Sequence, residues 1–444
     1  MWRRRFVREM QMIGRWQWVL KRIVRRLWFR AGLLSALGVA TALLALGVKR
    51  YIPESLSAHI GADAVDNILG IIASSMLATT TFSLNIMVSA FGSSTNTVTP
   101  RATPLLVEDT TTQNVLATFI GSFLFSLVGI IALSTGLYGN NGRVVMFAVT
   151  ICVIALIVYT LLRWIDHLAR LGRLGETTDR VEAAAIAALE DRRRRPFLGG
   201  ARLFDCRDVP PNAKAIHACS VGYVMHVDIP ALARLTDHGS SAIYVRAIPG
   251  SFVDLQTVLA SVVSTRAIDE EQVRAAFSIG VRRSFDQDPR FGISVLTEIA
   301  SRALSPAVND PGTAIDVIGR GVRILSMWAQ PGEVNAEAHV DCDRIFVPGL
   351  KLDDMFDDFF GPIARDGAGL VEVGMRLQKA LESLGRLHSA GYQAAAQRHS
   401  ELALRRAELA LQLEEDKEVL RVLASRVGKT QGKFASKSRN WPCF

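Results

Sequence analysis

The chain has 444 residues, of which 49% are hydrophobic and 21% charged, and its formal net charge is +9. This composition is too apolar for an ordinary soluble enzyme and too charged for a chain that lies within a bilayer throughout. The five cysteines show no spacing typical of a disulfide framework or a zinc site, so we expect no metal and no cofactor. The composition therefore predicts membrane spans joined to a globular part in a reducing compartment.

A basic leader opens the chain. Residues 1–30 contain nine Arg and one Lys, with Trp2, Trp16, Trp18 and Trp28 among them. Arginine and tryptophan together, directly before an apolar run, are typical of a segment at a membrane interface. We therefore expect the leader to contact anionic lipid headgroups and not nucleic acid. A leader that only sets the membrane topology is the alternative.

Four apolar runs predict the spans of a transmembrane domain at residues 31–165. They cover residues 31–48, 68–91, 113–138 and 144–162, and a helix of about 20 residues crosses the hydrocarbon core. Gly-Asn-Asn-Gly at 139–142 predicts a tight turn between the last two spans. Because Lys and Arg concentrate before the first span and after the fourth, we expect both termini on the cytoplasmic side of a bacterial inner membrane.

The second span carries more polar residues than a lipid-facing helix should. At 100° per residue, several of its hydroxyl and amide side chains share one narrow face, and the third span has a similar face. Uncharged polar groups at such positions either bond between packed helices or line a wetted path. The candidate pore or helix-packing residues are Ser74, Thr81, Asn85, Ser89, Thr118 and Ser122.

The part after the spans predicts an α+β domain on the cytoplasmic side. Residues 166–195 have the pattern of a helical stalk, and we expect its run Arg192–Arg195 to meet anionic lipid or solvent. Residues 215–265 alternate apolar and polar positions, with a turn at Pro249-Gly250, and predict a small β module.

Three further segments complete the chain. Residues 266–330 are expected to be helical, residues 331–427 to hold an acidic segment and two C-terminal helices, and residues 428–444 to be a disordered tail. The acidic run KLDDMFDDFF at 351–360 favours a helix with a solvated acidic face over a site for a divalent cation. The last two helices predict a hairpin or an oligomer contact.

Polar residues cluster around the helices predicted in residues 266–330. Asp310 before Pro311 is a natural N-cap, and capping alone explains it. Capping leaves the other polar residues nearby without a role. The candidate polar cluster is Arg283, Gln287, Asp288, Arg302, Asn309 and Asp310.

Two motifs carry a resemblance to a known family. They are Gly280-x-x-Arg283-Ser284-x-x-Gln287-Asp288-Pro289-x-Phe291-Gly292 and Ala303-Leu304-Ser305-Pro306-Ala307-x-Asn309-Asp310-Pro311-x-Thr313-Ala314. With these motifs the chain resembles, over residues 25–425, a bacterial family of predicted membrane proteins of unknown function. The resemblance implies an architecture and no activity. Ser251 stands where the family usually has Asp, and Asp166-His167 where it has two His.

Three functions are compatible with these features. The chain has no phosphate-binding loop, nucleophile elbow, dinucleotide fingerprint or metalloprotease motif, so the sequence leans away from an enzyme. We expect an α-helical membrane protein with four transmembrane helices, most simply a membrane-anchored scaffold or sensor that forms a homo-oligomer. A homo-oligomeric channel lined by the second span is the alternative, and a membrane-tethered enzyme that uses the polar cluster is the third.

Overall fold

The structure is a computed structural model. It describes residues 62–97, 99–107, 109–135, 139–169, 174–236, 241–266, 268–330, 342–387 and 389–428, with isolated positions between 29 and 40. The predicted leader, most of the predicted first span and almost all of the predicted tail lie outside these residues. The chain divides into two compact units, with the boundary between Thr177 and Thr178.

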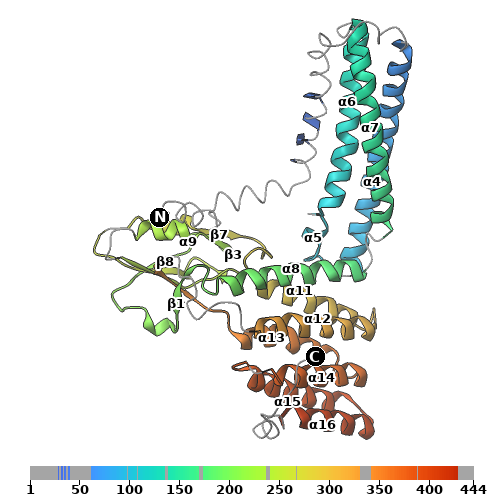
Figure 1. Cartoon of the computed structure of the whole chain (residues 1–444). Coiled ribbons are helices and arrows are strands. Elements are labelled where there is room, and N and C mark those ends of the chain that lie inside the picture. The colour runs from blue at the N-terminus through green and yellow to red at the C-terminus, as the bar shows by residue number, and fades with distance from the viewer. Residues whose placement is uncertain are drawn as a thin grey trace, which may run out of the picture. The chain divides into compact units, whose positions relative to one another are not determined.

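In the residues that the structure describes, three long apolar helices build the first unit, which we call the membrane unit (Figure 1). They are α4 (Ala62–Thr97), α6 (Thr110–Ser134) and α7 (Gly139–Leu168), with the short α5 (Thr103–Val107) between the first two. Each is long and apolar enough to cross a membrane. The second, third and fourth predicted spans fall on these helices, and the structure describes only isolated positions of the first.

The tight turn predicted at residues 139–142 is wrong. These residues form the first turn of α7, and the connection from α6 lies between Ser134 and Gly139. Glycine and asparagine favour turns, but they also suit the beginning of a helix, where they leave the first amides free to find partners.

Helix α6 contacts both other long helices of the membrane unit. One apolar core joins Leu69, Phe125 and Met146, and a second joins Met76, Phe119 and Trp164. A Cβ atom at Gly129 would lie 2.3 Å from the Cε atom of Met146. The glycine therefore allows α7 to approach α6 closely, as small residues do between membrane helices.

The second unit, which we call the α/β unit, begins in α8 (Leu174–Arg194) and contains two β-sheets. The larger sheet has the order β1-β8-β4-β6-β2, with β1 and β4 both parallel to β8 and the other pairs antiparallel. The smaller sheet has the order β5-β3-β7 and is antiparallel. Their strands are β1 (Gly200–Leu203), β2 (Lys214–His217), β3 (Gly222–Val227), β4 (Ala242–Val245), β5 (Phe252–Val253), β6 (Val258–Val263), β7 (Phe277–Gly280) and β8 (Cys342–Pro348).

The sheets reach beyond the predicted β module of residues 215–265. Strands β1, β7 and β8 lie outside those limits, and β7 falls in the stretch predicted to be helical. The module's core includes Val224, Ile243, Leu259 and Ile345, so β8 packs with strands almost 100 residues earlier in the chain. Three short elements connect the strands, namely η3 (Cys206–Asp208), α9 (Ile229–Leu235) and α10 (Glu270–Ala275).

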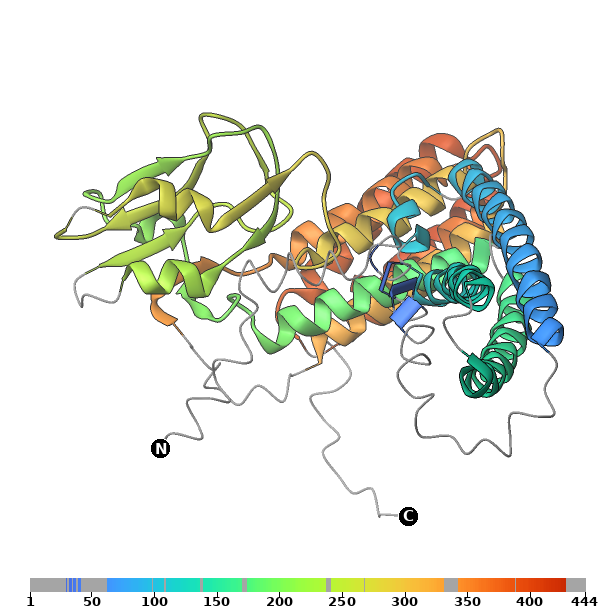
Figure 2. The same cartoon turned by 90° about the horizontal axis from the view of Figure 1, so that it is seen from above.

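Six helices form the rest of the described part of the α/β unit, and Figure 1 shows them stacked from α11 to α16. Figure 2, from above, shows the strands of residues 200–280, in green and yellow, apart from the orange and red helices. Two helices were predicted after residue 367, but the structure has three, because breaks at Gly391 and residues 411–413 divide that stretch. The helices are α11 (Pro289–Ala303), α12 (Pro311–Ala329), α13 (Leu352–Asp366), α14 (Val371–Gly385), α15 (Tyr392–Ala410) and α16 (Glu414–Gly428).

The acidic run falls on α13, and its carboxylates are not simply solvated. Arg290 of α11 binds Asp358 at 2.7 Å and Asp354 at 2.6 Å. Asp357 accepts a hydrogen bond from Arg398 of α15 at 2.9 Å. The opposite face, with Phe356, Phe359 and Phe360, is buried as predicted. Among the described residues no group of His, Cys, Asp and Glu is arranged to hold a metal ion.

Candidate functional site

The polar stripe predicted on the second span is exposed along α4. Ser74, Thr81, Asn85 and Ser89 are all exposed, whereas Ser83, on another face of the same helix, is fully buried. Asn67 extends the stripe toward the beginning of α4 and is also exposed. Sequence reasoning missed Asn67 because the predicted span began at Ile68, although its spacing of seven residues from Ser74 places it on the same face.

Two hydroxyls of this stripe, those of Ser74 and Thr81, have their protons occupied. Ser74 Oγ donates to the carbonyl of Gly70 at 3.0 Å, and Thr81 Oγ1 donates to that of Leu77 at 3.0 Å. Bonds to the carbonyl four residues earlier are the usual way in which a helix satisfies such donors. The oxygen lone pairs remain available, so the stripe offers acceptors to water, to a cation or to a donor on another helix.

The polar residues of the third span do not join this surface. Thr118 is half-buried and donates to the carbonyl of Asn114 at 2.9 Å, and Ser122 is buried within the membrane unit. Ser122 therefore lies among packed helices, whereas the four candidate residues of the second span are exposed. Ser122 is covered because α6 contacts both α4 and α7.

Hydropathy and burial are mismatched in α4. Its apolar segment has a mean hydropathy of 1.5, against 2.3 in α6 and 2.8 in α7. Only 28% of that segment is buried in the chain, against 56% for α6. A lipid-facing surface should be the more apolar one, and the exposed face of α4 is less apolar than the helix segments of α6 and α7.

A second polar site in the membrane unit joins the beginning of α6 to the end of α7. Asp109 caps α6, and its carboxylate lies 2.9 Å from Nε2 of His167. Thr112 donates to the same carboxylate at 2.5 Å, and Trp164 stacks on the His167 ring. These contacts give His167 a place in helix packing even though one histidine of the family's usual pair is absent.

The N-terminal half of the predicted polar cluster surrounds the beginning of α11. Asp288 is buried and caps this helix through the amide of Phe291, and Arg283 binds its carboxylate through two bonds of 2.7 and 3.0 Å. Gln287 accepts a hydrogen bond from the amide of Val227, at the end of β3. Burial raises the pKa of Asp288, while the Arg283 guanidinium acts in the opposite direction.

The turn predicted at Pro249-Gly250 meets the same carboxylate. Gly250 has a φ of +94°, and a Cβ atom there would lie 2.5 Å from Oδ2 of Asp288. The glycine is thus required twice, for its backbone conformation and for the close approach. Asp288 and Gln287 together join the β3 region to α11, which is a structural role.

Arg192 also lies near this carboxylate, contrary to the prediction that the arginine run meets solvent or lipid. Its side chain is buried, and among the described residues its guanidinium has no hydrogen-bond partner. Burial lowers the pKa of Arg192 to about 10, and the charges of Asp288 and Asp191 oppose this change. The burial of Arg192 could not be predicted from the sequence, because nothing in four consecutive arginines distinguishes the one that faces the core.

The C-terminal half of the predicted cluster lies at the other end of α11. Arg302 is in its last turn, Asn309 has a φ of +48°, and Asp310 caps α12 through the amide and hydroxyl of Thr313. The 15 residues of α11 place the two groups about 20 Å apart. The six residues therefore form two separate sites, and the capping role predicted for Asp310 is confirmed.

The two units together define an integral membrane protein whose apolar helices are joined to a mixed α/β unit. The chain belongs to the family described as "Predicted membrane protein (DUF2254)", whose match covers residues 24–383.

Relatives in mycobacteria match part of the chain. Uncharacterized protein Rv1290c of Mycobacterium tuberculosis and Uncharacterized protein Mb1321c of Mycobacterium bovis are each 25% identical over 247 residues. The match covers 53% of this chain and 47% of each relative, so the chain spans about half the length of these proteins. No solved structure was found to match the chain.

Proposed function

We propose that this protein is a homo-oligomeric membrane channel in which the α4 stripes of several copies face a shared, water-filled path. The observation that carries the proposal is the exposure of Ser74, Thr81, Asn85 and Ser89 on the least apolar of the three long helices. Polar groups that face hydrocarbon without partners are costly. Water in a path between copies would satisfy them.

The chemistry of the stripe favours small cations. The hydroxyl protons of Ser74 and Thr81 are bonded to backbone carbonyls of α4, which leaves oxygen lone pairs on the exposed side. Such oxygens can replace part of the hydration shell of a cation. Asn85 adds a side-chain carbonyl oxygen on the same face, and the described part of the stripe carries no fixed charge that would hold an ion tightly.

A membrane-anchored scaffold or sensor is the second candidate, supported by the small residues of the same face. Ala78 and Gly92 lie among the hydroxyls, and small residues let membrane helices approach closely. In that arrangement the stripe would bond to another copy and stay dry. Interhelical bonds of this kind average about 0.6 kcal/mol in membranes, so several are needed for a stable contact.

The proposed topology has four spans, with both termini on the cytoplasmic side of a bacterial inner membrane. The excess of arginine before residue 31 and after residue 162 supports this orientation. Reporter fusions at residues 138 and 300 test it. We expect the first on the outer side and the second on the inner side, and a reporter at residue 300 that is active only outside would refute it.

Ion flux into liposomes that contain the purified full chain tests the channel. Ser74→Leu and Asn85→Leu should strongly reduce flux, because an apolar side chain dewets a narrow path. Ser75→Leu is the matched control, since Ser75 is an exposed neighbour with the same type of backbone bond but lies about 100° around the helix.

Two outcomes would refute the channel. One is the absence of flux for every cation tested with the unmodified chain, and the other is an equal effect of Ser74→Leu and Ser75→Leu. Labelling of Thr81→Cys by a water-soluble thiol reagent separates the two candidates. A wetted path predicts rapid labelling, and a dry contact between helices predicts protection.

A further inference from the structure

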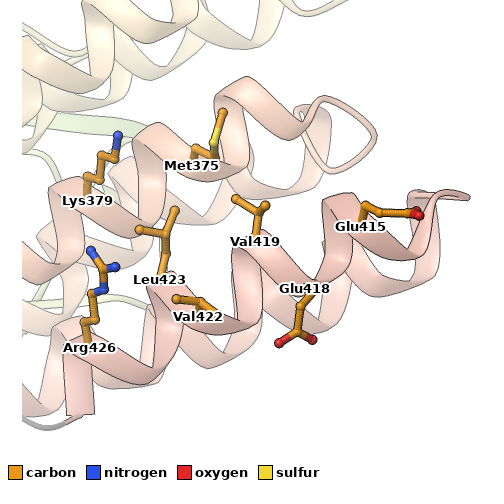
Figure 3. Close-up of a pocket in the computed structure, with 8 residues that line it drawn as sticks. All are labelled: Met375, Lys379, Glu415, Glu418, Val419, Val422, Leu423 and Arg426. Carbon is orange, nitrogen blue, oxygen red and sulfur yellow. The ribbon is translucent and has the colours of Figure 1, made fainter.

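A groove lies between α14 and α16 at the end of the α/β unit. Its volume is about 570 Å³, and Val419, Val422 and Met375 supply its apolar part. Figure 3 shows the cationic side chains Lys379 and Arg426 together at one end of the groove and the carboxylate of Glu415 at the other. The groove is therefore apolar in the middle, basic at one end and acidic at the other.

Four of the five exposed residues of α16 that line the groove have the spacing of a helix-pairing seam, and the fifth, Glu418, lies 3.4 Å from Arg421 of the same helix. Glu415, Val419, Val422 and Arg426 follow one another at intervals of four, three and four residues, and all four are exposed. This is the alternating spacing of the contact positions in a coiled coil. A partner helix is the natural occupant of such a seam.

The seam is complementary to itself in an antiparallel arrangement. A two-fold axis midway between Val419 and Val422 places each of these valines opposite the other valine of the second copy. The same axis places Glu415 opposite Arg426, because both lie equally far from the midpoint along α16. Contacts that match in this way are the property of a two-fold interface.

The charges at the two ends have no partners of their own. Glu415, Lys379 and Arg426 form no ion pair with any residue that the structure describes. Arg421, on the same helix, differs, because it binds Glu408 and Glu414 within the chain. The seam thus keeps opposite charges free at the two ends of an apolar centre.

We infer that two copies of this chain pair through the α14/α16 groove, with the α16 helices antiparallel about a two-fold axis. An axis perpendicular to the bilayer leaves both copies in the same orientation in one membrane. The inference deepens the proposed function, because it names one interface of the oligomer and rests on the chain forming one. It does not require α4 to conduct ions.

Cysteine crosslinking in membranes that contain the full chain, with the native cysteines replaced, tests the pairing. Val419→Cys should crosslink to itself through a short bis-maleimide linker, because the two positions lie about 5 Å apart along the helix axis. Arg426→Cys should not crosslink to itself, since the same geometry separates the two positions by about 16 Å. Co-expressed Glu415→Cys and Arg426→Cys copies should crosslink to each other.

Charge variants of the Val419→Cys chain test the complementarity. Glu415→Arg alone or Arg426→Glu alone should reduce association about tenfold, because each reversal turns two attractive pairs into repulsive ones. The double variant should restore crosslinking. Arg405→Glu, an exposed charge on α15 outside the groove, is the matched control for the single reversals and should leave the yield unchanged.

Several results would overturn the inference. They are no Val419→Cys crosslink above the background of an Arg405→Cys chain, self-crosslinking of Arg426→Cys, or a double charge variant no better than the single ones. Protection of Val419→Cys from maleimide without a dimer would identify another occupant, such as the segment after residue 428. Liposome flux tests the role of α4, and crosslinking tests the pairing through α16. A failure of one proposal is therefore distinguishable from a failure of the other.

Discussion

Replacement of Gly250 by alanine should loosen the junction between the β3 region and α11. Gly250 has a φ of +94°, and its missing Cβ atom would lie 2.5 Å from Oδ2 of Asp288. A side chain in the left-handed region costs about 1–2 kcal/mol. Displacing the carboxylate from Arg283 and the Phe291 amide costs about 1–2 kcal/mol more. We expect a local loss of about 2–4 kcal/mol from these two terms.

Hydrogen exchange of the full chain in detergent measures this loss locally. Amides that open through the junction, including those of Val227 and Phe291, report on it because they bond to Gln287 and Asp288. A loss of about 2–4 kcal/mol corresponds to exchange about 30 to 1,000 times faster, since each 1.4 kcal/mol is a factor of about ten. Amides of α4 should keep their rates.

Gly369→Ala is the matched control, because nothing lies within 4 Å of the place that its Cβ atom would take and its φ is not positive. It should change exchange by less than about threefold, as expected of an exposed substitution without new contacts. If Gly250→Ala exchanges no faster than Gly369→Ala at Val227 and Phe291, the proposed close approach of the turn to Asp288 is wrong.

Three other predictions concern the helices of the α/β unit. Gly321→Ala should destabilise α12 by about 1–3 kcal/mol through overpacking, because a Cβ atom would lie 2.0 Å from the Phe359 ring. Gly319→Ala is the control: its Cβ atom would face only the flexible end of Arg376, so it should be neutral or stabilising by up to about 1 kcal/mol. Equal shifts of the melting temperature in the two variants would contradict this prediction. Burial and Arg398 lower the pKa of His399, so the unfolded chain binds more protons near pH 6 and stability should fall as pH drops below about 6.5; a His399→Gln chain with the same pH dependence would refute it. Asp310→Ala should cost about 1 kcal/mol by removing the α12 cap. Hydrogen bonds to Thr313 lower the pKa of Asp310, so this stabilisation should be present above about pH 4 and lost as the pH falls through the lowered pKa. Hydrogen exchange of the α12 amides that is unchanged at pH 7 in the variant would contradict the capping role.

Local chemistry explains which features could be predicted from the sequence. Apolar length alone was enough to predict the three long helices, and Asp310 before Pro311 was enough to predict where a helix begins. Both depend on neighbouring residues and hardly on the rest of the fold. Strand β4 alternates between buried and half-buried positions and was found for the same reason, whereas β6 was found as a short, almost continuously apolar run.

Features that depend on distant partners could not be predicted. Arg192 is buried because of how α8 lies in the fold, and nothing in four consecutive arginines indicates which one faces inward. The six residues of the predicted polar cluster form two groups, because the length of α11 separates Asp288 at its beginning from Arg302 at its end. The exposure of the α4 stripe depends on which face α6 covers, and periodicity alone gives no information on that choice.

The place of β8 has a consequence for how the protein is made. This strand lies between β1 and β4, although more than 90 residues, including α11 and α12, separate it from β4 in the chain. During synthesis the larger sheet stays split until the ribosome has translated past Pro348. A fragment that ends before that residue would expose two open strand edges, which are templates for aggregation, so any shortened version intended for expression should retain β8.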